Sequence, residues 1–434
     1  MLPFAGWLYG KIAELRNSMY DRGVFRTYPL GARTISIGNI TTGGTGKTPL
    51  VVHVAELLAD AGEKVCILTR GYGRENARLR VLVSDGDKVL VDAHKGGDEP
   101  VEMGQRLLGK VAVVADANRV SAAAWAKDKL RITAFVLDDG FQHRRAKRDL
   151  DIVCIDAMNP FGGGRVLPAG DLREPLRNLA RADAIVITRS DVLNIQINRF
   201  VDAFTRLVKF VPRSKADLDE WYREAQRLKT DHLLMRGVSR YLPHFVWHYL
   251  SDADIRMKDE TYAAMQNQRI SLELEDLKES VDEVTKEIQA NSPNARVFIA
   301  RTQISGFRSL REFEVNEEEQ SWRELTPRGG DRLRALAFCA LGNPEAFFGQ
   351  LSIASPDKLD VSVTHVFPDH HYYTRSDISM LETKARAAQA DVFLTTAKDA
   401  VKLFELAFEL PCYVVDIEVG LDDPAGFRKL VTSS

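Results

Sequence analysis

The sequence predicts an α/β protein with a doubly wound sheet, followed by a mainly helical insert and a smaller C-terminal α/β domain. Three observations predict this architecture. Strand-like apolar runs alternate with helix-like runs from about residue 33 to 190. Between about 193 and 282 the chain becomes charged and helix-prone, and from 295 the alternation of strands and helices returns. The expected parts are an N-terminal helix at 1–28, an α/β domain at 29–192, the insert at 193–282 and the C-terminal domain at 283–434.

The first element is an amphipathic helix within residues 1–28. Its apolar stripe recurs at helical spacing and consists of Phe4, Leu8, Ile12, Leu15 and Met19, with Trp7 beside it. Basic side chains lie off the stripe at Lys11, Arg16 and Arg22. Two interpretations remain open: the helix packs on the first domain, or it lies in a membrane interface with its basic residues toward anionic lipid. We predict the membrane contact.

A phosphate-binding loop is predicted at the end of the first strand, in the stretch GNITTGGTGKTPL at 38–50. The strict pattern G-x-x-x-x-G-K-[ST] requires glycine where this chain has Thr41. The chemistry requires less: a strand, small residues that turn backbone N–H groups inward, a lysine, and a hydroxyl that opens a helix. All four are present, so we expect ATP to bind at Gly43, Gly44, Thr45, Gly46, Lys47 and Thr48.

A second conspicuous strand, at 134–137, ends in the acidic pair Asp138 and Asp139. P-loop proteins use such a carboxylate to hold Mg²⁺ opposite the loop threonine, here Thr48. Two acids after a strand are also compatible with a plain turn. The remaining strands of this domain are expected at 34–37, 64–69, 111–115, 152–155 and 184–188, and those of the C-terminal domain in RVFIART, VSVTHVF, DVFLTTAKD and CYVVDIEV.

Composition restricts the class of protein. The 434 residues carry a formal net charge of −2, which gives no reason to expect a nucleic-acid partner. The four cysteines are far apart, and three lie in apolar runs, which indicates buried thiols in a reducing compartment. We expect no signal peptide, and no apolar run approaches the roughly 18 to 20 residues of a membrane span.

Several short motifs occur together in a fixed order. They are GNITTGGTGKTP, TRGYG at 69–73, GGDEP at 96–100, LDDGFQHRR at 137–145, LPAGDLREPL at 167–176, ARTQISGFRSL at 300–310, FPDHH at 367–371 and TTAKDAVKL at 395–403. The set resembles the tetraacyldisaccharide 4'-kinase (lipid A 4'-kinase) family. The resemblance covers residues 1–192 and about 284 to the end, and the variant loop that begins at Gly38 is similar to that family's loop. For residues 193–282 we expect no counterpart in the family. Three alternatives stay open for this segment: it serves a partner that is unknown, it serves the membrane, or it serves neither.

The resemblance implies a reaction. The γ-phosphate of ATP is transferred to the 4'-hydroxyl of a tetraacylated glucosamine disaccharide 1-phosphate, by a peripheral (monotopic) protein on the cytoplasmic face of the bacterial inner membrane. It also implies roles: Lys47 neutralises phosphate charge, and Thr48 with the acidic pair holds Mg²⁺. Asp98 matches the base that takes the proton of the sugar hydroxyl, and His370 matches its partner.

Arg173 and Glu174 match active-site positions of the family, where the arginine can pair with phosphate oxygens and the glutamate with the metal or an arginine. A surface ion pair is the alternative for these two residues. Asp98 taken alone is typical of a turn, and Asp369, His370 and His371 taken alone would suggest a metal. The run at 143–148 is either a solvated face or a contact for acidic glycolipid.

Two further patterns are weaker evidence for a functional site. Thr188, Arg189, Ser190 and Asp191 end a strand where related NTPases read the base, but four residues do not support that assignment. His244 and His248 stand one helical turn apart near Asp252, which permits a metal site, although aromatic packing is favoured by their neighbours.

Two other classes of function compete with the kinase. A P-loop ATPase or GTPase that acts as a binding or assembly switch needs the loop and the metal carboxylates but no base for an acceptor hydroxyl. A catalytically inactive scaffold tolerates the loss of any of these residues, and none is lost. Asp98 and His370 therefore favour the kinase.

Overall fold

The structure is a computed structural model that describes residues 2–230, 238–316, 332–354 and 358–433. The described chain forms two compact units. One comprises residues 1–155, 161–188 and 294–434, and the other comprises 156–160 and 189–293. Residues 231–237, within the expected helical insert, lie outside the described residues.

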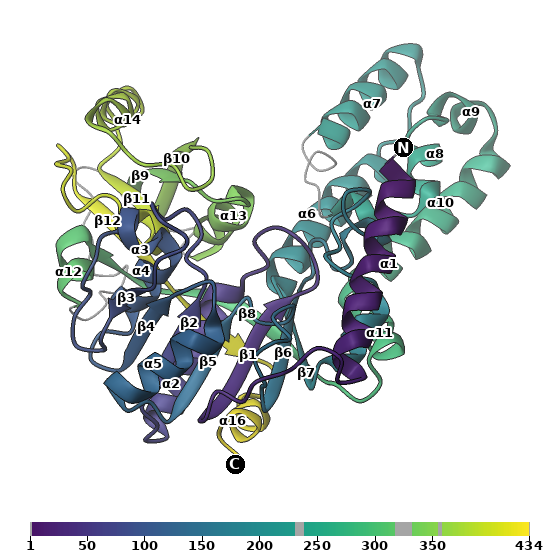
Figure 1. Ribbon diagram of the computed structural model, residues 1–434. Helices are drawn as coiled ribbons and strands as arrows, with labels where there is room; N and C mark the ends of the chain where they lie inside the picture. Colours follow the sequence, from purple (N-terminus) through teal and green to yellow (C-terminus); the bar gives the residue numbers. More distant parts are fainter. Residues whose placement is uncertain (1, 231–237, 317–331, 355–357, 434) are drawn as a thin grey trace. The chain divides into compact units, whose positions relative to one another are not determined.

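The first unit is built on a twelve-stranded sheet in the order β10-β9-β11-β12-β8-β7-β6-β1-β5-β2-β4-β3 (Figure 1). The strands are β1 (Arg33–Asn39), β2 (Val65–Thr69), β3 (Val81–Ser84), β4 (Val111–Ala115), β5 (Ala134–Asp138), β6 (Leu150–Asp156), β7 (Ala184–Thr188), β8 (Arg296–Ser309), β9 (Leu333–Cys339), β10 (Leu359–Val366), β11 (Val392–Thr396) and β12 (Cys412–Leu421). Most neighbouring strands are parallel, whereas β3 and β4, and β8 and β12, are antiparallel.

The long strand β8 joins the two sets of strands that the sequence assigned to separate α/β domains. Its first residues pair in parallel with β7, in the register Ala184 to Arg296. Its later residues pair antiparallel with β12, from Ala300 opposite Leu421 to Ser309 opposite Tyr413. Strands from both expected domains therefore share a single sheet within one compact unit.

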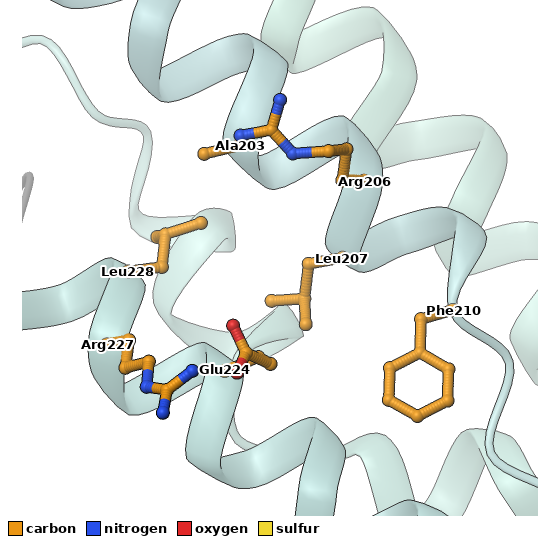
Figure 2. Close-up of a pocket in the computed structure, with 7 residues that line it drawn as sticks. All are labelled: Ala203, Arg206, Leu207, Phe210, Glu224, Arg227 and Leu228. Carbon is orange, nitrogen blue, oxygen red and sulfur yellow. Dashed lines mark hydrogen bonds and ion pairs between the residues drawn. The ribbon is translucent and has the colours of Figure 1, made fainter.

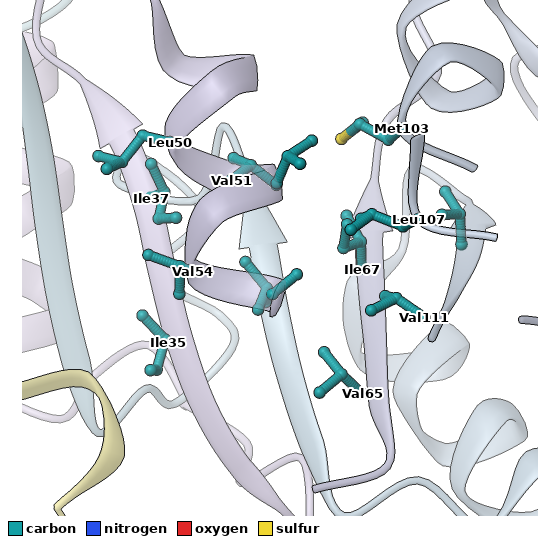
Figure 3. Close-up of a cluster of buried hydrophobic side chains, with 14 of the residues drawn as sticks. Ile35, Ile37, Leu50, Val51, Val54, Val65, Ile67, Met103, Leu107 and Val111 are labelled. Atoms are coloured by element: carbon teal, nitrogen blue, oxygen red, sulfur yellow. The ribbon is translucent and has the colours of Figure 1, made fainter. Parts of the chain in front are cut away.

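The helices of this unit are α1 (Leu2–Asp21), α2 (Lys47–Asp60), α3 (Ala93–Gly96), α4 (Asp98–Arg106), α5 (Arg119–Leu130), α12 (Leu310–Val315), α13 (Pro344–Ala354), α14 (Arg375–Ala387), α15 (Ala397–Ala400) and α16 (Pro424–Thr432). Helix α2 packs through Leu50, Val51 and Val54 on one face of the sheet (Figure 3). Cys66 and Leu68 of β2 point to the other face, where they meet the alanines of α5. Helices therefore cover both faces of this part of the sheet, as a doubly wound pattern requires.

The second unit is mainly helical. It contains α6 (Ser190–Lys209), α7 (Lys215–Leu228), α8 (His244–Tyr249), α9 (Ala253–Lys258), α10 (Glu260–Asp276) and α11 (Ser280–Asn291). Its buried aromatic residues include Phe204, Trp221 and Tyr249, and the Arg256 guanidinium lies over the Trp221 and Tyr249 rings. The unit thus has an apolar core of its own.

Two findings bear on the compartment and the membrane. All four cysteines are free and buried, as their apolar surroundings in the sequence indicate. Across the described parts of the chain, no helix combines the length and the apolar character that crossing a bilayer requires.

Candidate active site

The predicted phosphate loop connects the end of β1 to the start of α2. Gly43 and Gly46 have φ values of 96° and 72°, a left-handed region that favours glycine. Lys47 is the first residue of α2 and Thr48 the second, so both lie at a helix N-terminus, where backbone N–H groups and the helix dipole favour anions. The Thr45 side chain is buried and its hydroxyl accepts a hydrogen bond from Asn39 at 3.1 Å, so it is the backbone of Thr45 that remains for a phosphate.

The geometry around the loop explains why position 38 is a glycine and position 41 is a threonine. A Cβ atom added to Gly38 would lie 2.5 Å from Cβ of Phe141, which is too close for any side chain. Thr41 forms an isolated antiparallel bridge with Leu172, and the Arg173 N–H donates to the carbonyl of Ile40 at 2.8 Å. The chain around Thr41 is thus held extended beside residues 171–173, where threonine fits.

Asp138 and Asp139 lie at the carboxyl end of β5 and differ in environment. The Thr69 hydroxyl donates to Asp138 at 2.7 Å, and burial, with the nearby carboxylates of Glu99 and Asp139, raises the pKa of Asp138 to about 6. Asp139 has φ of 52° and lies 3.2 Å from the Lys47 ammonium. Burial opposes its ionisation, but Lys47 and Arg173 lower the pKa of Asp139 to about 2. The pair therefore offers one permanent carboxylate and one that titrates near neutral pH.

Arg173 and Glu174 point to different partners. Arg173 places one guanidinium nitrogen 2.8 Å from both carboxylate oxygens of Asp139. Glu174 is 3% exposed and accepts hydrogen bonds from Asn17 at 2.7 Å, Gln142 at 3.0 Å, Asn178 at 2.9 Å and Arg181 at 2.9 Å. The surface ion pair considered for these residues is thus not what the structure shows, because Glu174 is buried and Arg173 faces the acidic pair.

Asp98 and His370 meet although 272 positions separate them in the chain. Asp98 opens α4 and is 3% exposed, and the His370 Nδ1 atom lies 2.8 Å from its Oδ2 atom and 3.0 Å from Oδ1. Gly97 precedes it with φ of 91°, and a Cβ atom there would lie 2.9 Å from the carbonyl oxygen of Tyr72. The glycine of the GGDEP motif therefore allows the TRGYG segment to approach the dyad.

Two lysines of the TTAKDAVKL segment surround Asp98. The Lys402 ammonium lies 3.6 Å from its Oδ2 atom and that of Lys398 lies 3.9 Å away, while Lys398 also contacts Asp369 at 3.1 Å. Burial opposes ionisation of Asp98, but the His370 hydrogen bond and the two lysines hold its pKa below the usual range. The hydrogen bond to Asp98 raises the pKa of His370. The contact thus favours an ionised Asp98 and makes His370 a stronger base than a free imidazole.

Glu99 connects the dyad to the acidic pair. Its carboxylate lies 3.4 Å from Lys398 and is close enough to Asp138 to contribute to the raised pKa of that residue. The segment that carries Lys398 therefore lies near the carboxyl end of β5, which pairs with β1, the strand that leads into the phosphate loop.

The other sequence candidates have structural partners. In the basic run, Arg144 pairs with Asp21 at 2.6 Å and Arg148 with Asp151 at 2.6 Å, so two of its cations are used internally. The Thr188 hydroxyl donates to the carbonyl of Thr45 at 2.8 Å, which places the end of β7 beside the phosphate loop.

The histidines of the second unit do not form a metal site in the described chain. Asp252 accepts from Tyr262 at 2.6 Å and pairs with Arg256, while the rings of His244 and His248 meet edge to face with centroids 4.7 Å apart. No group of three or more His, Cys, Asp or Glu side chains suited to a metal ion occurs among the residues that the structure describes.

A pocket lies in the second unit between α6 and α7 (Figure 2). It has a volume of about 360 Å³ and is lined by Ala203, Arg206, Leu207, Phe210, Glu224, Arg227 and Leu228. Arg227 is paired with Glu224 at 2.6 Å. None of the predicted site residues lines it.

The sequence pattern of one protein family, LpxK: Tetraacyldisaccharide-1-P 4'-kinase, matches residues 1–260 and 271–434. The chain belongs to this family. A relative from Halothermothrix orenii, named tetraacyldisaccharide 4'-kinase, is 30% identical over 433 residues, which cover 98% of this chain and 89% of the relative. A relative of the same name from Anaeromyxobacter sp. (strain K) is 48% identical over 179 residues, 41% of this chain and 47% of its own.

A solved structure shares the fold and the family. The crystal structure of an "apo" form of LpxK from Aquifex aeolicus in complex with ATP matches with a TM-score of 0.61 and 25% identity, over 98% of this chain and 96% of that chain. The resemblance expected from the motif set is therefore confirmed. The expectation that residues 193–282 lack a counterpart in the LpxK family is wrong, because the family match includes residues 193–260 and 271–282.

Sequence reasoning missed the residues that support the predicted site. Lys398 and Lys402 stand four positions apart in a motif that was recognised, and this spacing was the available signal for a shared face. Thr69, which donates to Asp138, also belongs to a recognised motif, TRGYG. Gln142 likewise belongs to the recognised motif LDDGFQHRR. No local pattern marks Asn17, whose importance comes from contacts across the fold.

Proposed function

We propose that this LpxK family member transfers the γ-phosphate of ATP to the 4'-hydroxyl of a tetraacylated glucosamine disaccharide 1-phosphate, at a site formed by the phosphate loop, the acidic pair and the dyad. The observation that carries the proposal is the 2.8 Å contact between Asp98 and His370, beside the end of the sheet that holds the phosphate loop. A nucleotide switch has no use for a buried carboxylate and imidazole aimed at an acceptor.

In the proposed reaction Asp98 accepts the proton of the 4'-hydroxyl as the sugar oxygen forms its bond to the γ-phosphorus. The bond between that phosphorus and the bridging oxygen breaks, and ADP leaves. A carboxylate of lowered pKa is a weak base, so the raised pKa of His370 makes the imidazole the better place for the proton to rest. Lys398 and Lys402 keep Asp98 ionised before the proton arrives.

Lys47 and Arg173 are the two cations that we assign to stabilise negative charge on the phosphates. Both contact Asp139, so two cations and one carboxylate stand together beside the N-terminus of α2. Phosphoryl transfer is accelerated chiefly by positioning and by fixed charges that match those of the transition state. We assign Lys47 to the β- and γ-phosphates and Arg173 to the γ-phosphate.

The donor set fits magnesium. Mg²⁺ prefers oxygen ligands and is commonly held by one or two carboxylates together with substrate phosphates and water. Thr48, Asp138 and Asp139 would supply those oxygens, since they lie at the start of α2 and at the end of β5. Bound there, Mg²⁺ would neutralise charge on the phosphates. Glu174 is directed elsewhere, to Asn17, Gln142, Asn178 and Arg181, and supports Arg173 through Gln142 instead.

Transfer of ³²P from γ-labelled ATP to the purified disaccharide 1-phosphate in detergent micelles tests the proposed function. The expected product carries the label on the 4'-oxygen and resists exchange with free phosphate. The competing switch would release labelled inorganic phosphate at a rate that does not depend on the disaccharide. Release of that kind, without labelled lipid, would contradict the proposal.

We propose further that the protein sits on the cytoplasmic face of the inner membrane through α1. The apolar stripe of this helix, Phe4, Leu8, Ile12 and Leu15, is 46% to 69% exposed. Exposed apolar stripes of this kind, flanked by Trp and basic residues, favour the interface of an anionic bilayer. The acyl chains of the substrate reside in the same layer, so the contact raises the frequency of encounter.

Replacing Phe4 and Leu8 together by glutamate tests the membrane contact. The variant should sediment with anionic liposomes several-fold less than the parent, because two charges would enter the apolar face. ATP binding should be retained. Undiminished sedimentation of this variant would exclude α1 as the membrane contact and direct the search to residues 143–148.

A further inference from the structure

Helix α1 carries two faces with different partners. The apolar stripe faces solvent, whereas the buried residues of the helix are Gly6, Gly10 and Asn17. At about 3.6 residues per turn the buried face lies opposite the stripe. The two faces can therefore act at the same time.

The buried face fits closely against the chain before Arg173. A Cβ atom on Gly6 would lie 2.7 Å from Cβ of Ala169 and 2.9 Å from the carbonyl oxygen of Val166, so only glycine permits this approach. A Cβ atom on Gly10 would lie 3.6 Å from a methyl group of Val166. Helix α1 is thus seated on the segment that leads to Arg173 and Glu174.

A continuous line of hydrogen bonds runs from this face to the acidic pair. Asn17 donates its amide to Glu174 at 2.7 Å, and Glu174 accepts from Gln142 at 3.0 Å. The other end of the Gln142 amide accepts from Arg173 at 3.4 Å, and Arg173 contacts Asp139 at 2.8 Å. Each link except the weak Gln142 to Arg173 contact is a normal hydrogen bond or ion pair.

A second contact holds the same segment. Arg16, the neighbour of Asn17, donates to the carbonyl of Gln142 at 2.7 Å, and the Gln142 amide donates to the carbonyl of Asn39 at the end of β1 at 2.9 Å. Gln142 is therefore fixed from α1 at its backbone and through Glu174 at its side chain. A helix that served only as an apolar membrane anchor would not require the buried Asn17 amide, which donates to the Glu174 carboxylate.

We propose that Asn17 is a positioning residue, which makes α1 part of the catalytic apparatus as well as a membrane contact. Through Glu174 and Gln142 it sets the place of Arg173 beside Asp139, so a displaced α1 misplaces a phosphate-binding guanidinium. The inference rests on the proposed function, because it requires Arg173 and Asp139 to act in phosphoryl transfer. Helix α1 should therefore affect turnover even when no membrane is present.

The test compares two amides that donate to the same oxygen of Glu174. Asn17→Ala removes the amide that comes from α1, and Asn178→Ala removes one that comes from the same short helix as Arg181. In detergent micelles, with both substrates saturating, Asn17→Ala should lower kcat about tenfold, since small misplacements of charged groups are severe in their effect. KM for ATP and for the acceptor should stay within about twofold of the parent. The loss of kcat in Asn178→Ala should be smaller than the loss in Asn17→Ala by a factor of at least about three.

Asn17→Asp gives an independent signature. A carboxylate at position 17 would lie beside the Glu174 carboxylate. The repulsion between the two negative charges raises the pKa of one of them, so at lower pH the pair holds a shared proton that restores a hydrogen bond. The ratio of variant to parent kcat should therefore rise as the pH is lowered from about 8 to about 6. Should Asn17→Ala prove too unstable to purify, Asn17→Gln and Asn17→Asp are compared in its place, with the smaller loss expected for the glutamine, which keeps an amide donor.

The outcomes separate the inference from the proposed function. A parent protein that labels no disaccharide refutes the proposed function itself. An active parent with Asn17→Ala within about twofold of its kcat refutes the role of Asn17 alone. Equal losses in Asn17→Ala and Asn178→Ala would also refute it, because they would show that Glu174 merely requires its hydrogen bonds and that their origin in α1 is irrelevant.

Discussion

Replacing the two members of the dyad, singly and together, probes the site most incisively. We choose Asp98→Asn and His370→Ala. Asn keeps the shape of Asp98 in a place that is 3% exposed, so the fold around Lys402 is preserved while the charge is lost. The two residues are joined at 2.8 Å and come from distant parts of the chain, so neither change disturbs the local structure of the other.

The magnitudes follow from the contacts. Loss of His370 leaves Asp98 with Lys402 at 3.6 Å and Lys398 at 3.9 Å, so the carboxylate stays ionised but has no partner that holds the proton. We expect kcat to fall about 10²-fold in His370→Ala and about 10³- to 10⁴-fold in Asp98→Asn, within the range for general bases. Because the two act as a unit, the double variant should lose no more than about threefold beyond Asp98→Asn.

The assay is ³²P transfer to the disaccharide 1-phosphate in detergent micelles with both substrates saturating. ATP binding by each variant, measured by calorimetry, is the control for an intact nucleotide site. A double variant that loses about 10⁵- to 10⁶-fold, the product of the single losses, would refute the dyad, because independent groups contribute multiplicatively.

Three further outcomes are expected. The rate should rise with pH through a pKa above the usual value for histidine, because the raised pKa of His370 must be passed before the dyad is free to accept a proton; a pH profile of kcat/KM for the parent checks this. Lys398→Met should move the acid limb of the same profile to higher pH, because the Lys398 ammonium lowers the pKa of His370 and its removal lets that pKa rise; an unmoved limb would show that this lysine has no electrostatic effect on the dyad. Gly38→Ala should lower the free energy of unfolding in urea by about 1 to 3 kcal/mol, since its Cβ would meet Phe141. Gly349→Ala, inside helix α13 with open space for the added Cβ, should instead raise it by up to about 1 kcal/mol.

The sequence was informative where local chemistry determines structure. The strands at 111–115 and 184–188 are found at those residues, because buried parallel strands are apolar on both faces and stand out from their surroundings. The short edge strand β3 and most of β9 were missed. β3 is four residues long, and its pattern does not differ from that of a loop.

Local signals could not show how the two sets of strands combine. The first half of β8 pairs with β7 and the second half with β12, and no periodicity within residues 296–309 reveals that division. The sequence therefore suggested two separate domains where the strands form one sheet.

The same limit applies to the site. The loop residues Lys47 and Thr48 are recognisable because a single turn brings them together. The pairing of Asp98 with His370 was implied by the resemblance alone, since two residues 272 positions apart share no local pattern. The burial of Glu174 and its contact with Asn17 depend on how α1 is seated, which only the folded chain determines.

Single-turnover phosphate transfer by Lys47→Ala and Asp139→Ala tests the central claim, that the phosphate loop and the acidic pair form the site of phosphoryl transfer. Excess enzyme is mixed with labelled ATP and the disaccharide 1-phosphate, and the labelled lipid is followed with time. Both variants should transfer phosphate slower than the parent by at least about 10²-fold, because each loses a charge next to the reacting phosphate, while circular dichroism shows the fold retained. Near-parental transfer by either purified variant would contradict the account.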